Sequence, residues 1–282
     1  MPRPPIPLTV EDHRRDSAGM RYVYPVLSRR AGGVSIGINL NPNNACNWRC
    51  IYCQVPDLRR GGPPPVELGR LEAELSGLLE ALSDAGESPD FSVPPGTRIV
   101  DVAFSGNGEP LAAAEFPEAV EAVDRLLAAR GLGGLTRRLI TNGSLVGRKS
   151  ARRGLAVLAA GTGEVWFKLD AGTEAGYLRI NGTRTTPATV LRRLGACAAL
   201  CPTWVQTCVF ALDGRPPPEA ELAAYLELLA RAAPSLAGVH LYGIARPPMQ
   251  AEAPRLTRLP EAWLAALGAR IGALGLRVTV NP

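Results

Sequence analysis

Short apolar segments alternate along the chain with longer stretches in which apolar residues recur every three or four positions. Residues 34–40 and 98–104 have the pattern of strands, and the leucines within 68–82 fall on one helical face. The same alternation continues to the end of the chain. It predicts further strands over 138–141, 165–170, 204–212, 239–244 and 276–280, and further helices over about 115–130, 150–160, 187–200, 218–232 and from about 260 onward.

About six strand–helix units therefore follow one another, with no internal repeat and no linker in the sequence. Strict alternation predicts an α/β fold with a parallel sheet and right-handed crossovers. Six units are too few for a complete eight-stranded barrel, so a partial (β/α)6 TIM-like barrel is the first interpretation and a doubly wound sheet is the second. Residues 1–33, rich in Pro and Arg, are expected to form an N-terminal arm, and 34–282 the single barrel domain.

Composition narrows the class of protein. Of the 282 residues, 46% are apolar and 20% are charged, which is enough to bury a substantial core and excludes a mainly disordered chain. No apolar run reaches the roughly 18 residues of a membrane span, and the N-terminal residues lack a secretory pattern, so we expect a cytoplasmic protein without a membrane partner. The net charge of +5 permits an anionic partner without requiring one.

Six cysteines fall into two groups of three. The first group, Cys46, Cys50 and Cys53, has C-x3-C-x2-C spacing on the loop that follows the first predicted strand. Three thiolates this close together can hold three irons of a cubane cluster and leave the fourth iron open. A structural zinc site needs a fourth ligand, and His13 and His240 are both distant in sequence. Iron–sulfur chemistry is the leading hypothesis, with a non-catalytic iron–sulfur sensor and a zinc module as alternatives.

The cysteine loop, with an aromatic residue just before its third cysteine, resembles the signature of the radical S-adenosylmethionine (radical SAM) superfamily. The resemblance implies a [4Fe-4S] cluster on Cys46, Cys50 and Cys53, whose open iron binds S-adenosylmethionine (SAM). It also implies that one electron, from a donor such as flavodoxin or ferredoxin, cleaves SAM to methionine and a 5′-deoxyadenosyl radical. That radical would then abstract a hydrogen atom from the substrate.

Other motifs at predicted strand ends match the same superfamily. The segment Gly106-Asn-Gly-Glu109 is similar to a Gly-Gly-Glu motif that binds the methionine amino group, although an asparagine replaces the second glycine. The resemblance assigns cofactor-binding roles to Tyr52, Gly106, Asn107, Gly108, Glu109, Asn142 and Arg179. The alternatives are ordinary turns at Gly106–Glu109 and at Asn142-Gly143, and a solvated helix arginine at position 179.

Lys168, Asp170 and Arg246 are the predicted catalytic residues on the substrate side. Lys168 and Asp170 lie two residues apart at the end of one strand, so their side chains share a face. Lys168 is one of only two lysines in the chain, and it is expected to contact the SAM carboxylate, the substrate, or only Asp170. Arg246 follows the strand over 239–244.

Within the superfamily, the chain looks most similar to the wyosine-synthase-like group. The similar segments are Ser28-Arg-Arg30, Gly37–Leu40, the cysteine loop with Gln54, and Lys168–Gly172. Characterised members of that group rebuild a guanosine base in tRNA with pyruvate, and they carry three further cysteines before the radical loop. Residues 1–45 contain no cysteine, which departs from that pattern.

A nucleoside in tRNA or another RNA is therefore one predicted substrate class, and a small metabolite or peptide is the alternative. Paired basic residues, among them Arg137-Arg138 and Arg152-Arg153, would contact RNA phosphates if RNA binds, and are otherwise solvated charges.

The second group, Cys197, Cys201 and Cys208, has C-x3-C-x6-C spacing. The first two are one helical turn apart and the third lies on the following predicted strand. Core packing is the first interpretation. An auxiliary iron–sulfur cluster and a redox or substrate-binding thiol are the alternatives.

Overall fold

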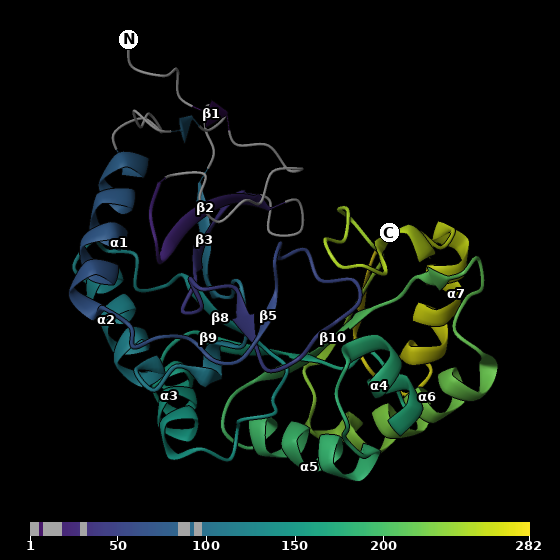
Figure 1. Cartoon of the computed structure of the whole chain (residues 1–282). Coiled ribbons are helices and arrows are strands. Elements are labelled where there is room, and N and C mark those ends of the chain that lie inside the picture. The colour runs from purple at the N-terminus through teal and green to yellow at the C-terminus, as the bar shows by residue number, and fades with distance from the viewer. Residues whose placement is uncertain (1–5, 8–18, 29–32, 84–90, 93–97) are drawn as a thin grey trace. The chain divides into compact units, whose positions relative to one another are not determined.

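The computed structural model describes residues 6–7, 19–28, 33–83, 91–92 and 98–282 (Figure 1). His13, Arg29 and Arg30, which entered the sequence argument, lie outside these residues. The chain divides into two compact units. Unit 1 comprises Met1–Ala45, Gly62–Ile140 and Lys149–Glu164, and unit 2 comprises Cys46–Gly61, Thr141–Arg148 and Val165–Pro282.

Unit 1 is built on four strands and three helices. β2 runs antiparallel to β3, whereas β3 pairs with β7 and β7 with β8 in parallel. The elements are β2 (Val23–Ser28), β3 (Gly33–Ile38), β7 (Ile99–Phe104), β8 (Thr136–Thr141), α1 (Leu68–Ser83), α2 (Phe116–Ala128) and α3 (Lys149–Ala160), with the short β1 (Ile6–Pro7), β6 (Phe91–Ser92) and η1 (Pro110–Ala112). The leucine stripe predicted on the first helix is buried, as at Leu71, Leu75 and Leu78, so the helix contributes one apolar face to the core.

Unit 2 repeats the strand–helix alternation. β10 pairs in parallel with β9 and β12, and β12 pairs in parallel with β14. The elements are β9 (Gly163–Lys168), β10 (Thr203–Cys208), β12 (Gly238–Tyr242), β14 (Val278–Asn281), α4 (Glu174–Asn181), α5 (Pro187–Ala198), α6 (Glu219–Ala232) and α7 (Glu261–Gly272), with the short η2 (Ala233–Ser235), η3 (Ala253–Arg255), β11 (Ala211–Leu212) and β13 (Leu256–Thr257). The short strands β4 (Ala45–Cys46) and β5 (Arg59–Arg60) flank the cysteine loop.

The predicted α/β class is confirmed: eight of the described strands form a mainly parallel sheet whose strands alternate with helices, as in a partial barrel. Parallel order places the carboxyl ends of neighbouring strands at one edge of a sheet. The candidate site residues, such as Lys168 and Asp170, are predicted at such strand ends. Within the described residues, no helix is long and apolar enough to cross a membrane.

Three elements differ from the sequence prediction. Part of the expected arm is the strand β2, whose V-Y-P-V-L-S sequence lacks alternation and contains a proline, which edge strands tolerate. The strand expected over 204–212 ends at Cys208. Helix α4 is not predicted by periodicity because it has only 8 residues, but its caps are in the sequence: the Thr173 side chain accepts from the Gly176 amide, and Gly182 ends the helix with φ 59°.

An aromatic layer lies beneath the strand ends of unit 2. The His240 ring stacks on Trp204 at 4.5 Å with an interplanar angle of 15°, and its centroid is also 4.5 Å from that of Trp166. The His240 ring nitrogen Nδ1 shares a hydrogen bond with the Thr279 hydroxyl. These contacts pack the half-buried His240 ring against two tryptophans, so it is not the core histidine that the sequence favours. Lys168 and Tyr242 lie two positions further along the strands of Trp166 and His240.

Candidate functional site

The cysteine loop is held by the C-terminal end of α4. The amide of Arg49 donates to the Asn181 carbonyl at 3.0 Å, and that of Ile51 donates to the Ile180 carbonyl at 2.9 Å. Gly182 permits this docking because a Cβ atom there would lie 2.8 Å from the Arg49 carbonyl oxygen, and because its φ is in the left-handed region. The loop is thus anchored by backbone hydrogen bonds rather than by its own side chains alone.

A second anchor comes from the segment after β12. The Met249 amide donates to the Cys53 carbonyl at 2.8 Å, and the Gln250 side-chain amide donates to the same carbonyl at 3.3 Å. Arg246 Nη1 donates to Gln54 Oε1 at 3.4 Å. Arg246, a predicted catalytic residue, therefore contacts the cysteine loop.

The three loop cysteines are half-buried, and the sulfurs of Cys46 and Cys50 accept hydrogen bonds from N–H groups. The Trp48 amide donates to Cys46 Sγ at 3.4 Å, and Asn181 Nδ2 donates to Cys50 Sγ at 3.3 Å. Burial raises the pKa of the Cys50 thiol to about 12, although the positive charge of Lys168 acts in the opposite direction. N–H donors to sulfur and a nearby cation both stabilise thiolate ligands, so this donor set fits an iron–sulfur cluster.

The cysteines are arranged differently from a mononuclear metal site. No three His, Cys, Asp or Glu side chains among the described residues are placed to hold one metal ion. A cubane has another requirement, because each thiolate binds a different iron atom. All six cysteines lie in the described part of the chain, and none forms a disulfide.

Asp170 accepts hydrogen bonds both from the cysteine loop and from the end of β10. Its Oδ2 accepts hydrogen bonds from the Tyr52 hydroxyl and, at 2.8 Å, from Asn181 Nδ2, while its Oδ1 accepts from the Cys208 amide at 3.0 Å. Asn181 is 0% exposed, and its Oδ1 has no hydrogen-bond partner among the described residues. Periodicity and motif reasoning missed Asn181, although its place just before the capping glycine could have pointed to it. The geometry gives Asp170 a positioning function, and its predicted catalytic function stays a prediction.

Lys168 faces the same cluster of side chains. Its Nζ donates to the Tyr242 hydroxyl at 3.2 Å and lies 5.0 Å from the centroid of the Tyr52 ring. Burial alone would lower the pKa of Lys168, but Tyr242 and the negative charge of Asp170 outweigh it and hold that pKa well above its usual value. Lys168 and Asp170 thus share a site, and the described residues show no ion pair between them. The prediction that both lie on one strand is wrong, because β9 ends at Lys168.

The second cysteine group is divided between two places, which corrects the auxiliary-cluster interpretation. Cys197 lies on α5 and Cys201 precedes β10, whereas Cys208 is the last residue of β10. Thr203 and Cys208 are separated by about 17 Å at the usual rise of a strand, and β10 is paired on both sides, so it does not fold back. Cys197 and Cys201 are core residues, 0% and 2% exposed.

Cys208, in contrast, belongs to the site. It packs in one apolar cluster with two residues of the cysteine loop, Ile51 and Tyr52, and with Phe210 from the chain that follows it. Burial raises the pKa of the Cys208 thiol well above its usual value.

Asn142 and Arg179 lie in unit 2 in different settings. Asn142 Nδ2 donates to Asn47 Oδ1 at 2.9 Å, and the Ser144 amide donates to Asn142 Oδ1 at 2.9 Å, so this amide connects the loop after β8 with the cysteine loop. Its expected contact with SAM stays a prediction. Arg179 lies on the last turn of α4, exposed, beside a cavity that Asp170 and Cys208 also line.

The Gly-Asn-Gly-Glu segment belongs to unit 1, where asparagines hold it. The Asn107 amide donates to Asn39 Oδ1 at 3.0 Å. Side chains at the two glycines would clash, since a Cβ on Gly106 would lie 2.3 Å from Asn39 Oδ1 and one on Gly108 would lie 2.6 Å from Asn41 Nδ2. Asn39 and Asn41 were not singled out from the sequence, although Asn-x-Asn directly after a strand is a readable signal.

Glu109 ends this segment and is 2% exposed. Its Oε1 accepts from the Leu111 amide at 3.1 Å and so caps the short helix η1. The capping interpretation of the motif therefore has direct geometric support, and the predicted binding of SAM by Glu109 stays a prediction.

Several of the basic residues expected to meet phosphates are bound to carboxylates within unit 1. Arg137 is buried and pairs with Asp124 at 2.7 Å, and Arg138 pairs with Glu164 at 2.6 Å. Arg153 pairs with Glu118 and Glu121 at 2.7 and 2.9 Å. These ion pairs account for the arginines without an RNA partner.

No protein-family model matches the sequence. Among curated proteins, the GTPase Obg of Brachyspira hyodysenteriae is 25% identical over 137 residues, which are 49% of this chain but only 18% of that protein. The match thus spans less than a fifth of the relative.

Two solved structures share the fold. A radical SAM methyltransferase from Sphaerobacter thermophilus superposes with a TM-score of 0.58 and 14% identity, covering 92% of this chain and 68% of that one. The protein anSMEcpe, solved with bound AdoMet, gives a TM-score of 0.50 and 17% identity, covering 76% of this chain and 52% of that one. Over most of its length, the chain therefore has the fold of these two proteins.

Proposed function

We propose that the protein is a radical SAM enzyme. The observation that carries the proposal is the C-x3-C-x2-C loop, anchored to the end of α4 and to the segment after β12, with N–H donors on the sulfurs of Cys46 and Cys50. A [4Fe-4S] cluster and SAM, when bound, supply reductive cleavage of SAM to methionine and a 5′-deoxyadenosyl radical that abstracts hydrogen from the substrate. Cys46, Cys50 and Cys53 would hold the cluster, and a carrier such as flavodoxin or ferredoxin would supply the electron.

The chain's own residues would position the reactants. Asp170 and Asn181 fix the cysteine loop against α4 and β10, and the half-buried Lys168 places a positive charge beside Tyr52. The SAM-binding functions of Tyr52, Gly106–Glu109 and Asn142 are part of this proposal and rest on the sequence resemblance.

The partial likeness to a GTPase supports no second function. A nucleotide-binding P-loop reads G-x-x-x-x-G-K-[ST], so its lysine follows a glycine. The two lysines of this chain follow Arg148 and Phe167 instead.

Two substrate classes are compatible with the proposed chemistry. A nucleoside in RNA and the likeness to the wyosine-synthase-like group rest on sequence motifs, and the ion pairs of Arg137, Arg138 and Arg153 give them no added support. A small metabolite or peptide is the other class.

The test is anaerobic reconstitution with iron and sulfide, followed by dithionite and SAM and by mass spectrometry of 5′-deoxyadenosine, with and without bulk unmodified tRNA. We expect product from the wild type, none from Cys53→Ala, and wild-type amounts from the matched control Cys201→Ala. A rise with tRNA selects the RNA substrate. Absence of 5′-deoxyadenosine from protein with an intact cluster overturns the proposal.

A further inference from the structure

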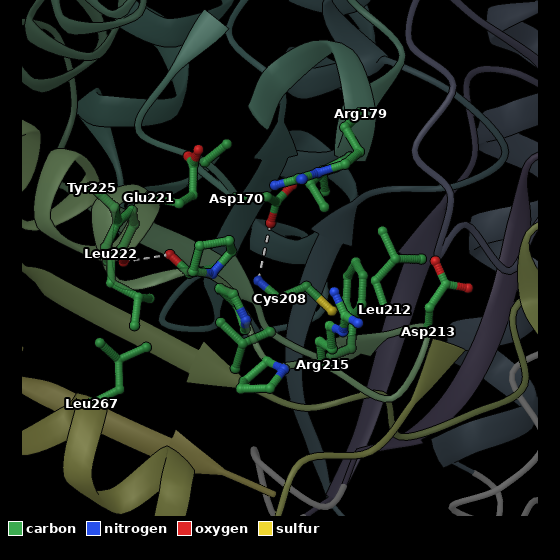
Figure 2. A pocket seen from close by; sticks show the side chains of 18 of the residues that line it. Asp170, Arg179, Cys208, Leu212, Asp213, Arg215, Glu221, Leu222, Tyr225 and Leu267 are labelled. Atoms are coloured by element: carbon green, nitrogen blue, oxygen red, sulfur yellow. Dashed lines mark hydrogen bonds between the residues drawn. The ribbon is translucent and has the colours of Figure 1, made fainter. Parts of the chain in front are cut away.

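A cavity of about 450 Å³ lies at the carboxyl ends of β9 and β10, entirely within unit 2 (Figure 2). Asp170 and Cys208 line it, and both also contact the cysteine loop: the Tyr52 hydroxyl donates to Asp170, and Cys208 packs with Tyr52 and Ile51. A molecule in this cavity would lie beside that loop. The volume is in the usual range of small-molecule sites.

Every carboxylate that lines the cavity is already bound by the protein. Asp170 accepts the three hydrogen bonds described above. Glu221 accepts from the backbone amide and the hydroxyl of Thr173, at 3.1 and 2.6 Å. Asp213 accepts two hydrogen bonds from Arg255, at 2.8 and 2.7 Å, and these lower the pKa of its carboxyl. None of the three acids is therefore left to bind a cation.

Two of the three arginines that line the cavity are, in contrast, available. Arg179 and Arg215 form no ion pair and no side-chain hydrogen bond with the described residues, although the charge of Arg215 also helps to lower the pKa of Asp213. They come from different elements, the last turn of α4 and the turn after β11, and Figure 2 shows them on either side of Asp170 and Cys208 in that view. The charge free to bind a ligand is positive, and guanidinium groups match carboxylate and phosphate oxygens.

The remaining wall is mostly apolar. Its side chains include Ile180, Phe210, Leu212, Leu222 and Leu267. The hydroxyls of Thr207 and Tyr225, which also line the cavity, form a hydrogen bond with each other at 2.7 Å between their oxygens. The cavity therefore offers cationic groups to a ligand's charged head group and an apolar surface to the rest of the ligand.

We propose that this cavity is the substrate pocket and that it takes a small amphiphilic anion, a carboxylate or phosphate head on an apolar body, with Arg179 and Arg215 binding the head. The proposal rests on the radical SAM function above and names the substrate class for it. It also places Arg179 on the substrate rather than on SAM.

The test measures binding by calorimetry to anaerobically reconstituted protein. The probes are phenyl phosphate, 4-phenylbutyrate and the uncharged 4-phenyl-1-butanol. The variants are Arg179→Gln and Arg215→Gln, and the control is Arg231→Gln, an exposed arginine of α6 that does not line the cavity. We expect at least one anionic probe to bind one per chain, with each pocket variant about tenfold weaker, since each removes a charge-assisted hydrogen bond. The control should bind as the wild type does.

The two anionic probes distinguish the two head groups, and the stronger binder identifies the head. Equal binding of the anions and the alcohol, or pocket variants that bind like the wild type, overturns the proposal. If SAM displaces the probe, Arg179 belongs to the cofactor site. If tRNA displaces it, the cavity binds RNA. Either result overturns the proposal. Formation of 5′-deoxyadenosine by the wild type is scored separately, so a failed pocket and a failed radical SAM function give different results.

Discussion

The loop Cys46–Gly61 and the segment Cys197–Cys208 each carry three closely spaced cysteines, and they use them differently. In the loop, Cys46 ends the two-residue strand β4, Cys50 and Cys53 lie on irregular chain, and all three thiols are half-buried. In the second segment, the strand β10 separates Cys208 from Cys201. Since a strand advances about 3.3 Å per residue, ligand spacing in a sequence predicts a shared site only where the intervening chain can curl back.

The chemical surroundings differ in the same way. Cys46 and Cys50 accept N–H donors, and the charge of Lys168 acts on Cys50. Cys197 and Cys201 are buried in the core. Cys208 combines features of both groups, because it is buried like the core thiols but packs against the cysteine loop.

The largest expected effect separates the two groups by iron content. Replacing Cys50 with Ala should remove essentially all of the about four irons per chain expected after reconstitution, because a cubane held by two thiolates has lost a required ligand. Iron and acid-labile sulfide analysis measures this loss. The matched variant Cys197→Ala should keep full iron content. Loss of iron in Cys197→Ala, or retention of iron in Cys50→Ala, would contradict the assignment of the cluster to the first cysteine group.

The next largest effect should be a difference in thiol reactivity between the two cysteine groups. In cluster-free protein treated with iodoacetamide, Cys46 and Cys53 should be alkylated first, and Cys208 at least about tenfold more slowly, because the thiolate reacts and burial raises the pKa of the Cys208 thiol. Since that pKa lies well above its usual value, raising the pH from about 7 to about 9 should leave Cys208 nearly inert. Peptide mass spectrometry gives the order. Labelling of Cys208 as fast as Cys53 would show that the packing around it opens in solution.

A smaller effect should follow from Asn181, which donates to Cys50 Sγ in the first group only. In Asn181→Leu the sulfur loses an N–H donor, so the reduced cluster loses stabilisation and its midpoint potential should fall. A net hydrogen bond of about 1 kcal/mol corresponds to about 40 mV for one electron. A redox titration followed by electron paramagnetic resonance measures the shift.

The control for this shift is Tyr177→Phe on the same helix. The Tyr177 hydroxyl is buried and has no hydrogen-bond partner among the described residues, so its removal should leave the potential unchanged. Asn181→Gln should recover part of the shift. An unchanged potential in fully loaded Asn181→Leu would show that this hydrogen bond is absent from the holoprotein.

Sequence reasoning reached the fold class and most elements because hydrophobic periodicity is a local property, as the buried leucines of α1 show. It also brought Lys168 and Asp170 to one place, although it set both on one strand, whereas β9 ends at Lys168 and Asp170 lies two residues beyond it. It missed Asn181 and misjudged Cys208 because their contacts join segments far apart in the chain, 131 residues in the case of Asn181 and Cys50. Such contacts depend on tertiary packing, which no local pattern encodes.

The smallest expected effect concerns stability. In Cys197→Ala, a small buried side chain is shortened, and the free energy of unfolding should fall by about 1 kcal/mol through lost packing contacts. Urea denaturation should show a lower midpoint with an unchanged slope. If Cys197 is only a core residue, iron content and 5′-deoxyadenosine formation stay at wild-type levels while stability falls. A variant that keeps its stability but loses iron would instead make Cys197 a ligand, and the division of the second cysteine group by β10 would not describe the holoprotein.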